Sequence, residues 1–234
     1  MFTVTPAWTA AFPGAAAGTL IMRSAGNLVS SPELQRSKLE SEQRLRARFG
    51  PVGKEGIRAT PALRAYDAYY RRFGKTYHVQ LQLESLVLKG RSIPGGLPLV
   101  EAMFTAELED LLLTAGHDVD ALRLPIVLDA AAGTERYTLL SGQEQVLKPG
   151  DMCMADAGGV ISSVLYGPDQ RTRITAGTRS VLFAVYAPAG IGADAVREHL
   201  QRIAANVRLM APQAMVEEQT VYQAPVASPA ERPD

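Results

Sequence analysis

Cysteine is almost absent from this chain, since Cys153 stands alone among 234 residues. One thiol cannot form an intrachain disulfide or an all-cysteine metal site, and its scarcity fits a reducing compartment. Cys153 lies in the apolar run Met152-Cys153-Met154. We therefore expect a buried, inert thiol rather than a nucleophile.

Signatures of metal and cofactor binding are also lacking. The three histidines, His78, His117 and His199, are scattered and show no zinc-ligand spacing. The chain contains no GxGxxG, GxxxxGK[ST] or GxSxG motif, which disfavours dinucleotide binding, P-loop chemistry and serine-hydrolase catalysis. We expect no metal and no cofactor, and no motif identifies a catalytic residue.

Long hydrophobic runs are missing as well. The first 20 residues, MFTVTPAWTAAFPGAAAGTL, have neither the basic start of a signal peptide nor a membrane-spanning length of apolar residues. We expect a cytoplasmic protein without a membrane partner.

Neither sign of charge dominates, because Lys+Arg and Asp+Glu both total 24. The charges are nevertheless segregated: residues 44–75 carry nine basic side chains against two acidic ones, and residues 101–135 carry eight acidic ones against Arg123. The basic segment could face a phosphate backbone and the acidic one an amine. Alternatively, both are solvated faces that pair with each other, as charge runs usually are.

Hydrophobic periodicity predicts helices first and strands afterwards. After a strand at 19–23, Ser31 caps a helix that starts with Pro32 and Glu33 and ends at Gly50-Pro51, with Leu39 among its partly buried residues. Further helices are expected at 61–73, 83–89 and 98–113. Strands are expected at 124–128, 136–140, 152–155, 160–166 and 180–187, followed by a helix at 194–210.

This order predicts an α+β fold with N-terminal helices, a largely antiparallel sheet and a C-terminal helix. A chain of this size with 47% hydrophobic residues can bury one compact core. We expect an N-terminal extension at 1–18, a single domain at 19–210 and a flexible, Pro/Ala-rich tail at 211–234.

The segment YRRFGKTYHVQLQLESLVLKGRSIPGGLPLVEAM, residues 70–103, resembles the start of the B3/B4 family. Free-standing members carry an arginine-rich helix ending in Phe-Gly-Lys, a Ser/x-x-Glu-x-Leu helix, a basic turn with Pro and a Pro-x-Val-Asp-x-x-Asn helix. The later runs GHDVDALRLPIVLDAAAGTERYTLL and KPGDMCMADAGGVISSVLYGPDQRTRITAGTRSVLFAVYAP resemble the family's Asp-x-Asp strand, its Pro-Gly-Glu turn and its closing hairpin and strand. The resemblance covers about residues 62–188.

This resemblance implies a cleft that, in the phenylalanyl-tRNA synthetase β subunit, removes a wrongly attached amino acid from tRNA. We expect an RNA-associated trans-editing protein that hydrolyses the ester of a mischarged aminoacyl-tRNA, with tRNA but not DNA as partner. The chain is too short for the synthetase's aminoacylation core, so a ligase is not expected.

The substrate-binding candidates are Glu84, Glu101, Ser163, Tyr166 and Thr178. The two carboxylates could bind an ammonium group or orient water. Ser163 and Tyr166 lie on the strand that resembles the pocket wall, and Thr178 lies in the Thr-rich entry to the last long strand. Each has a plainer interpretation, as surface helix pairs for the carboxylates and as ordinary strand residues for the others.

The tRNA-binding candidates are Arg71, Arg72 and Lys75, which the resemblance places near a nucleic-acid-facing surface. Contact with phosphate would make binding depend strongly on salt. The plainer interpretation is a solvated helix terminus.

The departures from the family support an alternative function. Phe104 stands where the family helix has Asn, and Ala115 where bacterial synthetases have His, while His117, two positions on, is expected to point elsewhere. The strongly basic hairpin of many free-standing members is SVLYGPDQ here. The alternative is a catalytically inactive module that binds an amino-acid-like small molecule. An open, polar cleft beside a positive surface would favour the deacylase, and a closed, apolar pocket would oppose it.

Overall fold

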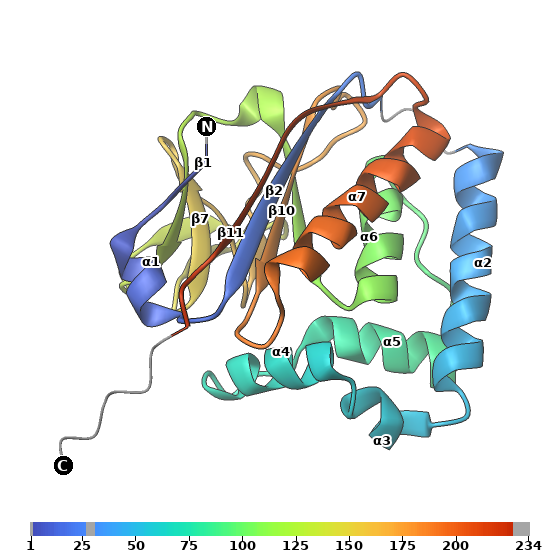
Figure 1. The fold of residues 1–234 in the computed structure, drawn as a ribbon. Helices are drawn as coiled ribbons and strands as arrows, with labels where there is room; N and C mark the ends of the chain where they lie inside the picture. The colour runs from blue at the N-terminus through green and yellow to red at the C-terminus, as the bar shows by residue number, and fades with distance from the viewer. Residues whose placement is uncertain (1, 27–30, 227–234) are drawn as a thin grey trace, which may run out of the picture.

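The structure is a computed structural model, and it describes residues 2–26 and 31–226 (Figure 1). Its helices are α1 (Pro6–Ala11), α2 (Pro32–Phe49), α3 (Gly53–Arg58), α4 (Pro61–Arg71), α5 (His78–Leu88), α6 (Pro98–Asp110) and α7 (Ala193–Met210). Its strands are β1 (Phe2–Val4), β2 (Ala16–Arg23), β3 (Leu113–Asp118), β4 (Ile126–Ala130), β5 (Arg136–Thr138), β6 (Glu144–Val146), β7 (Met152–Asp156), β8 (Gly159–Ser163), β9 (Gly167–Pro168), β10 (Val181–Ala187) and β11 (Met215–Gln223). The predicted α+β class is confirmed.

Two main sheets form the centre of the molecule. One has the order β1-β4-β7-β8-β9, the other has the order β11-β2-β10-β3, and β5 pairs with β6 separately. The β1–β4 pair is parallel, and the other ladders between described strands are antiparallel. The sheet is therefore largely antiparallel, as the sequence predicted.

Helix α7 covers the second sheet, and α6 and α2 lie beyond it, while α3, α4 and α5 close one end (Figure 1). The approach of α7 is close at Gly18 of β2, where a Cβ atom would lie 2.7 Å from Val196 Cγ1 and 2.9 Å from Leu200 Cδ1. Glycine is needed there because any side chain would push the helix off the sheet.

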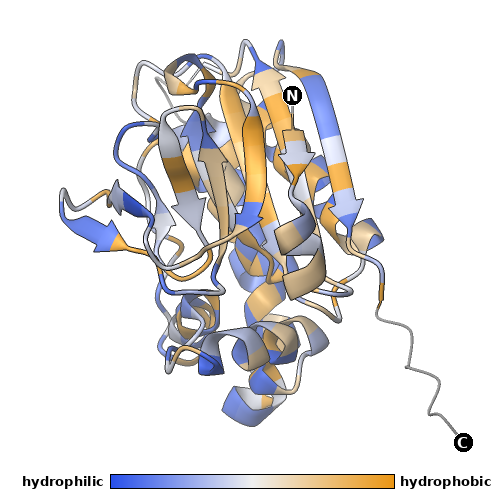
Figure 2. Cartoon of the chain, turned by 90° about the vertical axis from the view of Figure 1, so that its left-hand side faces the viewer, coloured by the Kyte–Doolittle hydropathy of each residue, from blue (hydrophilic) through white to orange (hydrophobic). Residues whose placement is uncertain are grey.

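The apolar core lies between these layers. Every residue of β10 is buried, and apolar residues colour much of the central strands orange in Figure 2. Helix α4 is anchored to the core by Tyr66, whose ring stacks on Tyr77 at 4.1 Å and whose hydroxyl accepts a hydrogen bond from Leu113 N at 2.8 Å. The end formed by α3, α4 and α5 is thus fixed against β3.

Several predicted elements agree with the structure. Ser31 Oγ accepts a hydrogen bond from Leu34 N at 3.0 Å and Gly50 is the C-cap, so α2 has the predicted bounds. Leu39, however, is 56% exposed and does not belong to the buried face. Helix α6 ends before 113, because Leu111 adopts a left-handed conformation, φ 61°, and the chain continues directly into β3.

Both ends of the described chain contain more structure than the sequence indicated. Residues 1–18 include β1, α1 and the start of β2. The segment expected to be a flexible tail contains β11, which is paired with β2 and carries Tyr222 against Trp8 at a ring distance of 5.7 Å. An edge strand exposes half of its surface, so its composition remains polar. Residues 227–234 lie outside the described part.

Within the described ranges, no helix is both long enough and apolar enough to cross a membrane.

Candidate functional site

A pocket of about 460 Å³ opens between α5, the connection 89–97 and α6. Its walls come from three consecutive segments of the chain. The lining residues are Gln82, Ser85, Leu86, Lys89, Arg91, Ser92, Ile93, Pro94, Phe104 and Leu108. The volume lies in the range of small-molecule sites.

Two acidic side chains hold the connection in place. Glu42 of α2 accepts a hydrogen bond from Ile93 N at 2.7 Å, and Glu101 of α6 accepts one from Gly96 N at 2.7 Å. Arg46 donates to the Arg91 carbonyl at 3.0 Å. The pocket wall is therefore braced from both sides, although the segment has no regular secondary structure.

The pocket combines an apolar floor with a few polar groups. Leu86 and Ile93 are buried, and Phe104 is half-buried beside them. Gln82 Oε1 is buried without a hydrogen-bond partner among the described residues. A buried amide oxygen without a partner is costly, so a ligand that donates a hydrogen bond there would gain from filling it.

Positive charge lies at the edge of the same pocket. Lys89 and Arg91 are exposed, and neither forms an ion pair with a carboxylate in the described part of the chain. The ten lining residues include no carboxylate and no histidine. The pocket can thus hold an anion and a hydrogen-bond donor, but it offers no carboxylate or imidazole as general base.

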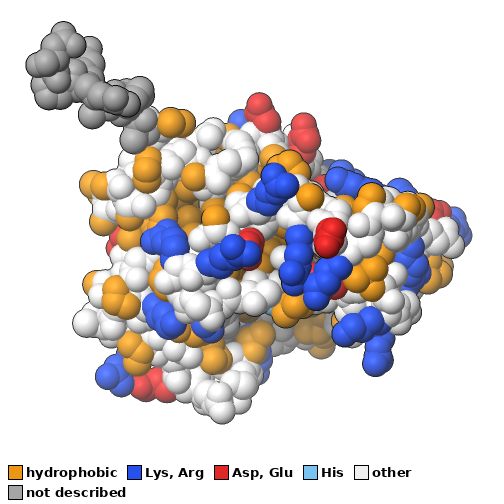
Figure 3. Space-filling model, turned by 90° about the horizontal axis from the view of Figure 1, so that it is seen from below, with side chains coloured by type: hydrophobic (Ala, Val, Ile, Leu, Met, Phe, Trp, Pro, Cys, Tyr) orange, Lys and Arg blue, Asp and Glu red, His pale blue; other side chains and the backbone are white. Residues whose placement is uncertain are grey.

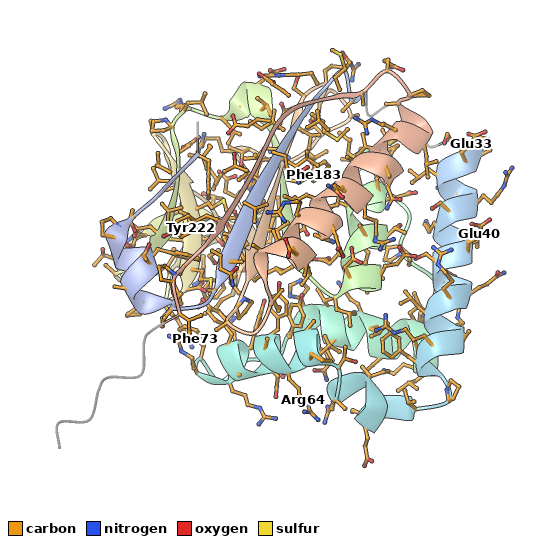
Figure 4. The ribbon with its side chains drawn as sticks, in the orientation of Figure 1. Glu33, Glu40, Arg64, Phe73, Phe183 and Tyr222 are labelled. Carbon is orange, nitrogen blue, oxygen red and sulfur yellow. The ribbon has the colours of Figure 1, made fainter. Side chains whose placement is uncertain are left out.

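A basic face lies on α3, α4 and the turn that follows α4. Its exposed or half-buried cations are Lys54, Arg58, Arg64, Arg71, Arg72 and Lys75. Figure 3 looks onto this end of the molecule and shows Lys and Arg side chains gathered over it, and Figure 4 shows Arg64 directed away from α4. Helix α5 joins this face to the pocket, because Glu84 pairs with Arg58 at 3.4 Å while Gln82 lines the pocket.

The three tRNA-binding candidates differ in their surroundings. Arg71 pairs with Asp67 of the same helix at 2.9 Å. Arg72 lies over the rings of Tyr69 and Phe73, at 5.4 Å from each. Lys75 lies over the ring of Tyr166 at 4.2 Å. Arg72 and Lys75 therefore contact aromatic side chains, and neither has a carboxylate partner among residues 2–26 and 31–226.

Lys75 brings two of the substrate-binding candidates into the same neighbourhood. Its partner Tyr166 donates its backbone N–H to Ser163 Oγ at 3.3 Å. Next to them is the buried Asp151, which accepts hydrogen bonds from Tyr69 Oη at 2.6 Å and Leu165 N at 3.3 Å. Ser163 itself is only 1% exposed, so in this structure it does not face an open cleft.

Burial raises the pKa of Asp151 to about 6, although hydrogen bonds from Tyr69 and Ser163 oppose the rise. Asp151 was not singled out from the sequence. The available signal was its place directly after Pro149-Gly150 and before an apolar strand, where a charged residue needs partners.

The remaining candidates lie apart from this cluster. Glu84 accepts a hydrogen bond from Gln80 at 2.8 Å and pairs with α3; burial opposes its ionisation, but the bond from Gln80 and the nearby cations lower its pKa overall. Glu101 braces the 89–97 connection and accepts from Gln35 at 2.7 Å. Thr178 donates to Asp118 at 2.6 Å.

A buried polar chain connects the two main sheets, and the sequence did not indicate it. Thr172 donates to Asp169, so its oxygen accepts from His117 Nδ1 at 2.8 Å. His117 Nε2 then accepts from Ser162 Oγ at 3.2 Å, and Ser162 accepts from Tyr186 at 2.6 Å. Ser162 and His117 are both 0% exposed, so we assign this chain to the structure of the core and not to catalysis.

The side chain of His117 was expected to point elsewhere than the residue at position 115, but the two positions share one face of a strand. Both residues lie on β3, and residues two apart on a strand share a face. That face lies toward β8, where Ser162 is located.

The fold and the pocket together define an α+β domain with a ligand-sized site beside a basic face. No known protein-family model matches the chain. The phenylalanine–tRNA ligase beta subunit of Anaeromyxobacter dehalogenans is 35% identical over 101 residues, which is 39% of this chain and 12% of that protein. The chain is thus similar in sequence to one segment of a much longer relative.

A solved N-terminal fragment of the phenylalanyl-tRNA synthetase beta subunit from Pyrococcus horikoshii has 14% identity and a TM-score of 0.49. That match covers 94% of this chain and 50% of the fragment.

Proposed function

We propose that this chain is an RNA-associated trans-editing protein that hydrolyses the ester of a mischarged aminoacyl-tRNA. The observation that carries the proposal is the pocket between α5, the 89–97 connection and α6. Among the described residues, its Gln82 oxygen has no hydrogen-bond partner and its two cations have no carboxylate partner, whereas its apolar floor departs from the polar cleft expected of a deacylase. The sequence similarity to a segment of a phenylalanine–tRNA ligase beta subunit supports a tRNA-related function.

Each part of the pocket suits one part of such a substrate. The amino-acid side chain packs against Phe104 and Leu108, and Gln82 Oε1 accepts a hydrogen bond from the substrate's ammonium group or from the attacking water. Arg91 stabilises the oxyanion that develops on the ester carbonyl. The tRNA backbone lies along the basic face of α3 and α4.

Hydrolysis then needs no covalent intermediate. The water oxygen bonds to the ester carbonyl carbon, the carbon–oxygen bond to the ribose breaks, and the proton lost by the water ends on the ribose oxygen. The products are the free amino acid and the tRNA with its terminal hydroxyl restored. A positioned water and oxyanion stabilisation can support this step without an acid–base side chain in the pocket.

The test is release of radiolabelled amino acids from a panel of correctly charged and mischarged tRNAs. We expect selective release of one mischarged amino acid, and a loss of about tenfold or more in Arg91→Gln, because a charge-assisted contact to the oxyanion is removed. The matched control is Arg136→Gln, whose side chain pairs with Glu144 on the separate β5–β6 pair. Equal rates in both variants would contradict the role of the pocket.

A second function, a binding module for an amino-acid-like small molecule, is favoured by Phe104. This residue places an aromatic ring in the pocket at the position where the resembling family has a polar side chain. Spontaneous rates across the whole panel, combined with saturable binding of a free amino acid that Arg91→Gln weakens, would support this function over the deacylase.

A further inference from the structure

A second pocket, of about 300 Å³, lies beside α4 and shares no lining residue with the proposed editing site. It is bounded by the end of α1, by α4, by the start of β7 and by the residues after β10. The lining residues are Ala11, Phe12, Pro13, Ala15, Ala65, Ala68, Tyr69, Arg72, Met152, Pro188 and Ala189. Small alanine side chains on three sides leave the space open.

The walls of this pocket are apolar, and their polar atoms are already engaged. Tyr69 Oη donates to Asp151 at 2.6 Å and accepts from Met152 N at 2.6 Å, which leaves it little capacity for a ligand. Phe12 and Met152 are 5% and 1% exposed and contribute hydrocarbon surface. A ligand must therefore bring a mainly apolar body.

Arg72 is the one charged side chain among the lining residues. Its guanidinium lies 5.9 Å from the Phe12 ring centroid and 5.4 Å from that of Tyr69. Among the described residues it has no ion pair with a carboxylate, whereas its neighbour Arg71 is paired with Asp67 at 2.9 Å. A guanidinium beside an apolar wall, without a carboxylate partner in the described ranges, favours a bidentate carboxylate ligand.

We propose that this pocket binds a small carboxylic acid with an apolar tail or ring. The carboxylate of the ligand pairs with the Arg72 guanidinium, and its apolar body packs among Phe12, Ala65 and Ala68. The size is suitable, since an engineered cavity of about 150 Å³ in another protein holds benzene, and this pocket is larger. The two pockets share no lining residue. Arg72 also belongs to the basic face proposed for tRNA, so binding of the acid is tested without tRNA and does not depend on hydrolysis.

The experiment compares 3-phenylpropionate with its neutral amide, 3-phenylpropionamide, by titration calorimetry on the full chain. We expect the acid to bind at least about tenfold more tightly than the amide, because only the acid makes a charge-assisted pair with Arg72. In Arg72→Gln this preference is lost. In the matched control Arg71→Gln it remains.

The comparison of acid and amide on the unaltered protein holds even if Arg72→Gln folds poorly. Ala68→Trp, a substitution at an exposed position of α4, fills the pocket and should abolish binding of both compounds. Three outcomes would overturn the proposal: no binding of the acid at millimolar concentration, equal binding of acid and amide, or the same loss in Arg71→Gln as in Arg72→Gln.

Discussion

His117 of β3 and Ser162 of β8 are joined by a hydrogen bond of 3.2 Å that crosses from one main sheet to the other. Burial lowers the pKa of His117 to about 3, and although Asp156 raises it, Arg171 lowers it further. The imidazole is therefore neutral in the folded protein at neutral pH, as its acceptor role toward Ser162 requires.

The first prediction concerns acid stability. Because the unfolded chain takes up a proton at His117 near pH 6.5 and the folded one only near pH 3, stability is lost as the pH falls through this window. The loss attributable to this group is up to about 1.4 kcal/mol per pH unit. The free energies of unfolding of the parent and of His117→Gln, measured with urea at a series of pH values, should converge as the pH falls. Parallel profiles would show that His117 is not the titrating group.

The second prediction concerns alkaline stability and Glu107. Burial raises the pKa of this carboxyl to about 8, although a hydrogen bond from Thr114 N, at 2.9 Å, lowers it. The contribution of Glu107 to the free energy of unfolding is complete below pH 4.5. It is lost as the pH rises toward 8, at up to about 1.4 kcal/mol per pH unit.

Glu107→Gln keeps an oxygen for Thr114 but cannot ionise. We expect it to unfold at a higher temperature than the parent at pH 8.5 and at nearly the same temperature at pH 4.5. Thermal unfolding followed by circular dichroism measures both. If the unfolding temperatures of the variant and the parent differed equally at pH 4.5 and pH 8.5, ionisation of Glu107 would not be the cause of the difference.

Local signals predicted local structure well, but none of the five substrate-binding candidates lines the candidate pocket. The Ser31 cap and the Gly50 end of α2 are contained in a few neighbouring residues, so the sequence specified them. The pocket depends on contacts between distant segments, such as Glu42 with Ile93, which no local pattern shows. The polar chain through His117 depends on strand pairing for the same reason.

Glu101 illustrates the difference between what local patterns predict and what contacts between distant segments determine. Its placement on a helix was predicted, yet its partners are Gly96 N, Gln35 and, at 3.6 Å, Lys38. Glu101, which the sequence predicts to bind substrate, contacts the connection that forms the wall of the pocket, so its removal should affect ligand binding indirectly.

The third prediction follows from this contact. Glu101→Ala removes the acceptor of the Gly96 and Gln35 hydrogen bonds and leaves the buried Lys38 without its carboxylate partner, so it should lower the free energy of unfolding by about 2–4 kcal/mol. The control is Glu40→Ala on α2, which Figure 4 shows pointing away from the molecule and which pairs only loosely with Arg44, at 3.9 Å. The control should change stability by less than about 0.5 kcal/mol. Equal effects of the two variants would contradict the bracing role.

The last prediction concerns the ring of Phe104, which occupies part of the candidate pocket. Phe104→Ala removes it from a half-buried position, so the pocket should accept larger amino-acid side chains. Apolar pockets discriminate between side chains by about 10–200-fold for a single methylene, so we expect the ratio of aromatic to small side chains accepted to rise by at least about tenfold in Phe104→Ala. Leu88→Ala, at an exposed position of α5 outside the lining, is the control. The measurement is the ratio of rates, or of dissociation constants if no hydrolysis occurs, across an amino-acid panel. An unchanged ratio of rates or dissociation constants in Phe104→Ala would mean that the side chain of the ligand does not lie against this ring. The pocket between α5 and α6 would then not be the ligand site in either proposed function.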